Sequence, residues 1–126
     1  MSFRYSLRYH PPMPAAEIAL GAPETDFTLG PLPAILDTGG DITLIPREYL
    51  IQLDAPVVAG GFLSSPWGER ESVKIYEVNL RIAGRDLYHI EVASQVDGRE
   101  VLLGRNVLNL LNLQLDGPNE MVLMLP

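Results

Sequence analysis

Hydrophobic and polar residues alternate along much of the chain with the period of two that is typical of half-buried β-strands. In residues 3–9, aromatic and aliphatic side chains at the odd positions are separated by polar ones at the even positions. Within residues 73–82 the apolar positions change parity, which predicts a twist or bulge near Tyr76. Short apolar or alternating segments predict strands at residues 3–9, 16–20, 32–36, 41–45, 57–63, 73–82, 87–93, 101–103 and 121–125.

A helical spacing of apolar residues occurs near the C-terminus, in residues 107–111, and Asn106 is placed to cap the start of that helix. Residues 46–50 predict a single helical turn, with Pro46 at its first position. The pattern therefore predicts a mainly β protein with one short C-terminal helix. The length of 126 residues suits one domain that spans residues 1–126.

The composition narrows the chemistry that the chain can support. Its 11 Gly and 11 Pro favour short strands and tight turns over a helical bundle. The chain has no Cys, which excludes disulfide bonds, a thiolate zinc site and a cysteine nucleophile. The two histidines, His10 and His89, lie far apart and have no Glu or Cys at ligand spacing. We therefore expect neither a metal site nor a cofactor.

The charge and the termini narrow the range of partners. The formal net charge of −7 argues against a nucleic-acid partner, because few basic side chains are available to neutralise phosphates. The N-terminus lacks the apolar run of a signal peptide. No segment approaches the roughly 18 apolar residues needed to span a bilayer. These features predict a cytoplasmic protein without a membrane partner.

The sequence Asp37-Thr38-Gly39 is the strongest candidate for a chemical site. The tripeptide by itself is typical of a tight turn, in which Asp bonds to the backbone and Gly supplies flexibility. Here it stands between the apolar segments 34–36 and 42–46. A carboxyl group between two apolar strands would be poorly solvated, which disfavours its charged form. The context therefore favours a functional acid over a surface turn.

Residues 35–46, with the sequence ILDTGGDITLIP, resemble the active-site loop of the retropepsin-like aspartic proteases. This family comprises the retroviral protease and single-domain bacterial relatives. A second segment, residues 102–108 with the sequence LLGRNVL, is similar to the family's apolar-apolar-Gly-Arg-Asp/Asn segment. The resemblance covers about residues 14–125. It implies a retropepsin-like closed β-barrel, the acid protease fold, and the activity of an aspartic endopeptidase on peptide or protein substrates.

The resemblance also implies a homodimer. Aspartic proteases use two carboxyl groups that share one proton, and this chain has a single Asp-Thr-Gly. Asp37 of each of two subunits would therefore face the other across a two-fold axis. Thr38 would cross-link the two loops, and Gly39 would let the backbone turn beneath the carboxyl pair. Arg105 would form a structural ion pair with Asp41. The terminal segments would contribute to the dimer, as they do in retroviral relatives.

The chain departs from the family at Gly40, where Ala or Ser is usual, and this change could widen the substrate site beside Asp37. The predicted hairpin around residues 64–69 falls at the position of the family's flap, which closes over bound peptide. Trp67, the only Trp, would act either as a lid over the substrate or as a core anchor. The expected substrate-binding residues are Gly40, Asp41, Ser65, Pro66, Trp67 and Gly68. The alternative function is a non-catalytic homodimeric module that retains the fold and binds peptide or mediates dimerisation.

Overall fold

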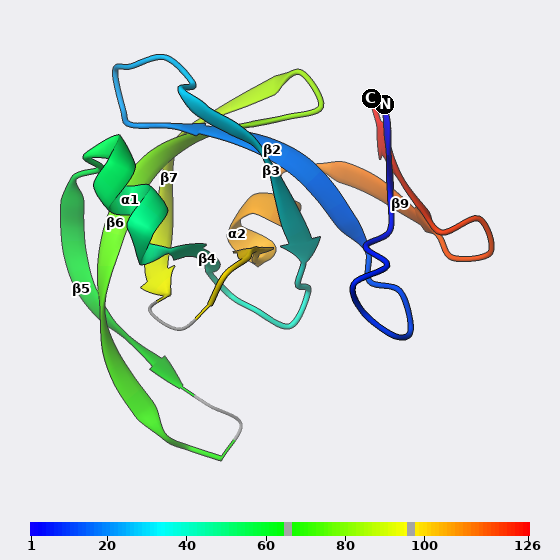
Figure 1. Ribbon diagram of the computed structural model, residues 1–126. Helices are drawn as coiled ribbons and strands as arrows, with labels where there is room; N and C mark the ends of the chain where they lie inside the picture. The colour runs from blue at the N-terminus through cyan, green and yellow to red at the C-terminus, as the bar shows by residue number, and fades with distance from the viewer. Residues whose placement is uncertain (65–66, 96–97) are drawn as a thin grey trace.

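The computed structural model describes residues 1–64, 67–95 and 98–126, and it is built mainly of β-strands (Figure 1). The mainly β class predicted from the sequence is confirmed. Ser65 and Pro66, two of the expected flap residues, lie outside the described residues. In chain order the elements are β1 (Ser2–Arg4), β2 (Ala15–Gly21), β3 (Leu29–Leu36), β4 (Thr43–Pro46), α1 (Arg47–Leu53), β5 (Val57–Ser64), β6 (Arg70–Ile82), β7 (Arg85–Gln95), β8 (Val101–Leu103), α2 (Arg105–Leu108), β9 (Asn112–Asp116) and β10 (Met121–Leu125).

Within the described residues, six strands form a closed barrel in the order β2-β3-β8-β4-β7-β6. The barrel closes because β6 pairs with β2 as well as with β7. Its interior is filled by aliphatic side chains that are fully buried, including Leu20, Ile45, Val78, Leu80 and Leu103. The pairs β3–β8 and β4–β7 are parallel, and the remaining pairs in the barrel are antiparallel. The expected closed barrel is therefore present.

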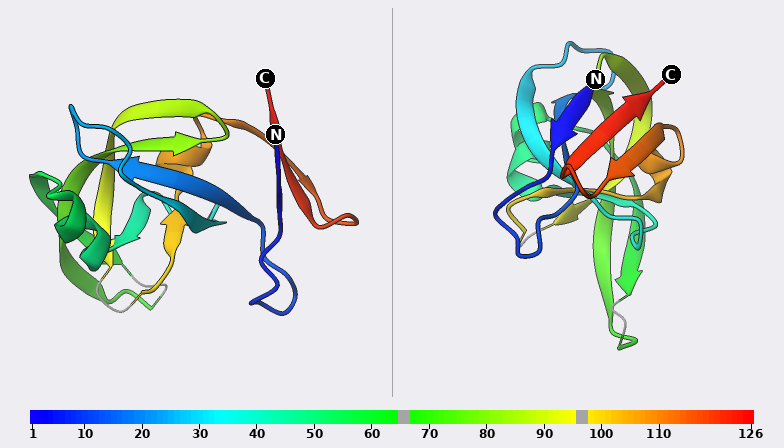
Figure 2. Two further views of the ribbon diagram at one scale, coloured as in Figure 1. Left: turned by 45° about the horizontal axis from the view of Figure 1, so that its top comes forward. Right: turned by 90° about the vertical axis from the view of Figure 1, so that its right-hand side faces the viewer.

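Strand β5 extends the sheet beyond β6, and the two strands form a hairpin that projects from the barrel (Figures 1 and 2). The pairing of β5 with β6 shifts register between Val57 and Ala59, which lie opposite Tyr76 and Ile75. An irregularity thus lies opposite Tyr76, but it is on β5 and not, as predicted, within residues 73–82. The shift arises because one extra residue on β5 is accommodated there, while β6 continues without interruption.

The chain termini form a separate three-stranded sheet in the order β1-β10-β9, beside the barrel (Figure 2). Strand β10 lies in the middle and pairs with β1 and β9 of its own chain. Val122, on β10, is fully buried. The predicted strand at residues 3–9 is too long, because β1 ends at Arg4 and the following loop contains only a single bridge between Ser6 and Met13.

The helices also differ from the prediction. Helix α1 begins at Arg47 and runs to Leu53, so Pro46 ends β4 and is not the first residue of the helix as predicted. Helix α2 has only four residues. The apolar residues after α2 leave the helix because Asn112 begins β9, a strand that the sequence pattern did not indicate. Tertiary pairing of β9 with β10 thus overrides the local helical spacing. No helix in the described ranges is long and apolar enough to cross a membrane.

A second irregularity places His89 between two carboxylates. The β6–β7 register shifts between Val78 and Leu80, and His89 on the opposite strand has a φ of 55°. The imidazole Nδ1 bonds to the Glu77 carboxylate, and Nε2 lies 3.9 Å from Oε1 of Glu24. The hydrogen bond and the charge of Glu77 raise the pKa of His89 above its ordinary value.

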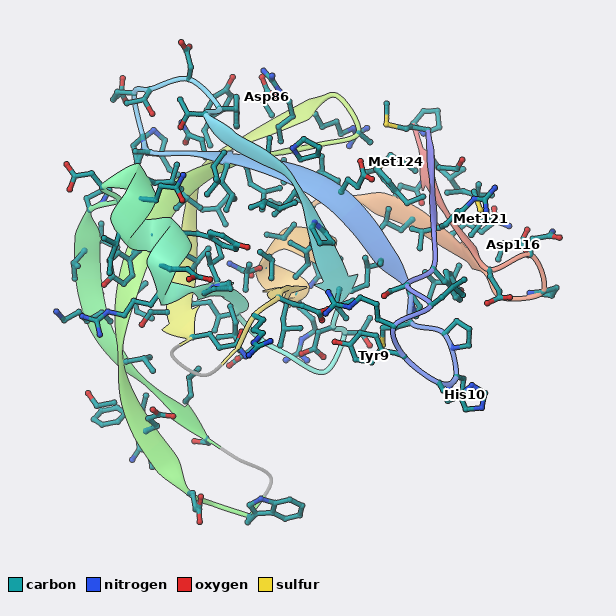
Figure 3. All side chains as sticks on the ribbon, in the orientation of Figure 1. Tyr9, His10, Asp86, Asp116, Met121 and Met124 are labelled. Carbon is teal, nitrogen blue, oxygen red and sulfur yellow. The ribbon has the colours of Figure 1, made fainter. Side chains whose placement is uncertain are left out.

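We expect His89→Gln to lower thermal stability more at about pH 5.5 than at about pH 9. The pKa of His89 is raised in the folded state, so its contribution is fully present below the ordinary imidazole pKa and is lost as the pH rises through the folded-state pKa. Calorimetric melting of both proteins across this range measures the difference. His10→Gln is a matched control, because His10 lies at the end of the N-terminal loop and has no ion pair among the described residues (Figure 3). An equal loss of stability at both pH values would contradict the expectation.

Candidate active site

Asp37 lies directly after β3, at the start of the loop that leads to β4. Its backbone N–H donates to the carbonyl of Leu103 at the end of β8, at 2.9 Å. Because β3 and β8 are parallel, their carboxyl ends meet at one edge of the barrel. The half-buried carboxylate of Asp37 accepts a hydrogen bond from the N–H of Gly39 at 3.1 Å. The carbonyl of Asp37 accepts from the N–H of Gly40, which closes a tight turn.

The second motif of the sequence holds this turn from the side. The N–H of Arg105 donates to the carbonyl of Gly40 at 2.8 Å, and its guanidinium donates to the carbonyl of Thr38 at 2.9 Å. Arg105 and Thr38 are 67 positions apart in the sequence. The fold thus brings the two motifs into direct contact. The side chain of Thr38 and the backbone of Gly39 are exposed at the surface of the chain.

The predicted ion pair between Arg105 and Asp41 does not form in this chain. Asp41 is exposed and takes part in no ion pair within the described residues. The guanidinium of Arg105 bonds to the Thr38 carbonyl instead. Arg105 therefore holds the loop by bonding to a backbone carbonyl, that of Thr38, and not to a carboxylate side chain.

Thr43 and Asn106 form a buried polar connection that the sequence did not reveal. The side-chain carbonyl of Asn106 accepts from both the N–H and the hydroxyl of Thr43, each at 2.9 Å. The Thr43 hydroxyl in turn accepts from the N–H of Gly104 at 3.0 Å. The amide group of Asn106 donates to the carbonyl of Glu91. Asn106 is thus not the expected N-cap of α2, where Gly104 stands without a side-chain cap.

The fully buried Thr43 is the missed residue of this connection. A Thr within an apolar strand was the available signal, because a buried hydroxyl group needs a hydrogen-bonding partner. The identity of that partner depended on the position of α2. The connection fixes the start of β4 to Gly104 and to Asn106 of α2, and so it supports the Asp37 loop from its C-terminal side.

We expect Asn106→Ala to lower the free energy of unfolding by about 2–3 kcal/mol. The substitution leaves the buried N–H and hydroxyl of Thr43 without their acceptor. Denaturant unfolding at a fixed protein concentration measures the change. Asn109→Ala, which removes an exposed Asn at the end of the same helix, should change stability by less than about 0.5 kcal/mol. Equal effects of the two substitutions would show that the connection to Thr43 contributes nothing.

Gly40 leaves the Asp37 carboxylate uncrowded. A Cβ atom at Gly40 would lie 3.0 Å from Oδ2 of Asp37 and 3.4 Å from its Cγ. At Gly39 the corresponding distance to Oδ1 is 3.4 Å, an ordinary contact. Any side chain at position 40 would therefore press against Oδ2 of Asp37. The departure from the family at Gly40 opens space beside the carboxyl group.

The hairpin tip carries the remaining expected residues that the structure describes. Trp67 is 83% exposed, so it is not a core anchor. Gly68 adopts a φ of 87°, which favours glycine, and so the chain can turn back toward β6. Among the residues that the structure describes, no three His, Cys, Asp or Glu side chains form a group that could hold a metal ion.

No protein-family model matches the chain, and no curated protein matches it. Several solved structures are similar to most of it, and three of them are described below. The EIAV protease in complex with the inhibitor HBY-793 has 19% identity and a TM-score of 0.62, over 85% of this chain and 92% of that chain. A retropepsin-like aspartic protease from Rickettsia conorii has 11% identity and a TM-score of 0.63, over 97% and 86%. The retroviral protease-like domain of Ddi1 from Leishmania major has 15% identity and a TM-score of 0.54, over 90% and 94%. The chain therefore has the retropepsin-like fold of the aspartic proteases.

Proposed function

We propose that the protein is an aspartic endopeptidase whose active site is assembled from Asp37 of two identical chains. The observation that carries the proposal is the Asp-Thr-Gly turn at the carboxyl end of β3, held by Leu103 and Arg105 within a retropepsin-like barrel. Asp37 is only half-buried, and Thr38 is exposed, so a second copy can approach this loop.

The proposed chemistry follows from two carboxyl groups that share a proton. Like charges about 3 Å apart cannot both ionise, so one Asp37 is a carboxylate and the other is protonated. The carboxylate accepts a proton from a water molecule, whose oxygen attacks the peptide carbonyl carbon. The protonated partner donates to the carbonyl oxygen. Collapse of the tetrahedral intermediate then breaks the C–N bond, and the leaving amine takes the proton that the first Asp37 accepted from the water, while the partner Asp37 regains its own proton from the hydroxyl group formed on the carbonyl oxygen.

The bonds around the turn would keep the two acids in position. Repelling groups need a rigid support, and each loop is held by the Arg105 guanidinium on the Thr38 carbonyl. In the proposed dimer the exposed hydroxyl of Thr38 would bond to the loop of the partner copy. The substrate would be a peptide or protein segment in an extended conformation. We propose the cytoplasm as the location, since a chain without Cys suits a reducing compartment.

Proteolysis of a peptide library at acidic to neutral pH tests the proposal. The wild type should cleave a subset of peptides, and Asp37→Asn should cleave none of them. Specific activity should also fall as the protein is diluted, because only the dimer has both acids. Equal cleavage by the two proteins would assign the activity to a contaminant and overturn the proposal.

A non-catalytic homodimeric module is the second candidate function. The similarity to the retroviral protease-like domain of Ddi1 and the departure at Gly40 leave room for it. In that case the same library would yield peptides that bind without being cleaved. Isothermal titration calorimetry with wild type and Asp37→Asn would then show equal affinities for these peptides.

We expect the fluorescence of Trp67 to shift to shorter wavelength when a peptide-like aspartic protease inhibitor binds. Trp67 is the only Trp and is 83% exposed at the hairpin tip, so closure over a ligand would transfer the indole from water to a less polar site. Emission spectra during a titration measure this change. Trp67→Phe should remove the signal. Calorimetric proof of binding with an unchanged spectrum would place Trp67 away from the ligand.

A further inference from the structure

Among the described residues that pair between β5 and β6, those on one face include two cations and no carboxylate. Gly60, Phe62 and Ser64 pair with Lys74, Ser72 and Arg70 respectively, so their side chains share one face because strand side chains alternate. All six residues are exposed. We call these six residues the outer face. The chain as a whole has 16 Asp and Glu against 9 Lys and Arg, so a face without acids differs from its average surface.

The edge of β5 beside the outer face is open. β5 is the last strand of its sheet and pairs only with β6 among the described strands. Alternate N–H and C=O groups of such a strand point away from its one neighbour. The eight residues of β5, VVAGGFLS, include no charge and no Pro, which are the usual protections of an edge strand. The exposed side chains of Val57, Val58 and Phe62 add apolar surface.

Both cations of the outer face can reach this open edge. The guanidinium of Arg70 lies over the ring of Phe62, with Cζ 4.5 Å from the ring centroid, so its charge already lies above β5. Lys74 stands opposite Gly60. A Cβ atom at Gly60 would meet no described atom within 4 Å, so the space over this residue is empty. The long side chain of Lys74 can cross Gly60 and present its ammonium group at the edge of the sheet.

We propose that the open edge of β5 binds an extended acidic segment of another protein by strand addition. A strand added beside β5 would place side chains four positions apart next to Gly60 and Ser64, about 13 Å from each other. Carboxylates at these two positions would meet Lys74 and Arg70. Main-chain hydrogen bonds supply the affinity in such an arrangement, and the two cations supply the selectivity for acids.

The charge of the outer face favours an acidic segment over a second copy of the hairpin. A copy paired through its own β5 would bring the same two cations to the same side and no carboxylate. The binding does not depend on the chemistry of Asp37, so it goes beyond the proposed peptidase activity.

Fluorescence anisotropy with Asp37→Asn protein tests the proposal without cleavage of the probe. The probe is a fluorescein-labelled peptide, Thr-Glu-Val-Thr-Val-Glu-Thr, whose Glu residues are four positions apart. A second peptide has Lys at both Glu positions, and a third has the Glu sequence with alternate backbone amides N-methylated on one edge. We expect the Glu peptide to bind at least about fivefold more tightly than the other two at low salt.

Substitutions at Lys74 and Gly60 test whether the ammonium group of Lys74 recognises the acidic peptide. Lys74→Glu should weaken binding of the Glu peptide by about five- to tenfold, whereas Arg85→Glu, the same charge change at an exposed site on β7, should change it by less than about twofold. Gly60→Ile should fold normally, because the space at Gly60 is empty. It should reduce the preference for the Glu peptide over the Lys peptide to about twofold or less, since its side chain blocks the path of Lys74.

Three results would overturn the proposal. Equal binding of the N-methylated peptide would exclude strand addition, and equal binding of the Lys peptide would exclude recognition of acids. If Lys74→Glu changed self-association in sedimentation experiments while leaving peptide affinity unchanged, the edge would be a contact between copies of this chain. None of these results depends on whether the wild type cleaves peptides, so this proposal and the proposed function fail separately.

Discussion

A tandem dimer in which one of its two copies of Asp37 is changed to Asn is expected to hydrolyse peptide at least about 10³-fold more slowly than the tandem wild type. The two copies would be joined by a flexible Gly/Ser linker, so that every molecule contains one Asp and one Asn. An amide can neither accept a proton from water nor share one with the remaining acid. The loss measured as kcat would therefore show that both chains contribute a reacting group.

The tandem wild type is the control for the linker, and it should match the activity of the untethered dimer. A thermal melt should show both tandem proteins folded. Within the described ranges, the Asp37 carboxylate accepts only the local bond from Gly39, and Asn can replace it as an acceptor. Substantial activity in the half-substituted protein would mean that one chain carries a complete site. That result would remove the main reason for proposing a shared one.

Gly104→Ala is expected to lower the free energy of unfolding by about 3 kcal/mol and the Tm by about 10 °C. A Cβ atom there would lie 2.5 Å from the carbonyl carbon of Ile42, 2.6 Å from its oxygen and 2.9 Å from the nitrogen of Thr43. These are backbone atoms, so the two segments must separate. The bond from Gly104 N–H to the Thr43 hydroxyl would be strained, and activity should fall with it.

Gly60→Ala is the matched control for this substitution. It also adds one methyl group to a glycine, yet no described atom lies within 4 Å of the new carbon. Its effect on stability should be within about 0.5 kcal/mol, or slightly stabilising, because Ala restricts the unfolded chain. Denaturant unfolding at one protein concentration compares the two variants. A similar small effect of both would show that the close approach of Gly104 to Ile42 relaxes without cost.

Most strands could be predicted because their evidence is local. The change of parity near Tyr76 is reproduced, because Ile75 and Tyr76 are both buried. The expected alternation is broken at Asn79, which is buried between Val78 and Leu80. The C-terminal region was less predictable. Residues 107–111 have helical spacing, but the helix ends at Leu108 because β9 pairs with β10. The pairing of β9 with β10 is a tertiary contact, and it leaves no periodic pattern in the sequence of β9 that would reveal the strand.

The candidate site also had a part that the sequence predicted and a part that it did not. The motif containing Asp37 and the motif containing Arg105 were both visible in the sequence, and their contact in the structure agrees with their joint assignment. Which atoms meet was not predictable, since Arg105 bonds to the carbonyl of Thr38 and not to the carboxylate of Asp41. The role of Asn106 likewise depended on a Thr43 hydroxyl that only the fold brings near.

The sequence by itself determined the strand-rich class, the acid at position 37 and the single copy of its motif, because these depend on residue type and local period. The tertiary structure decided the closure of the barrel, the support of the Asp37 turn by Leu103 and Arg105, and the open edge of β5. Each of these is a relation between segments far apart in the chain. Side-chain patterns record whether a residue is buried, but not which distant backbone atom will lie beside it.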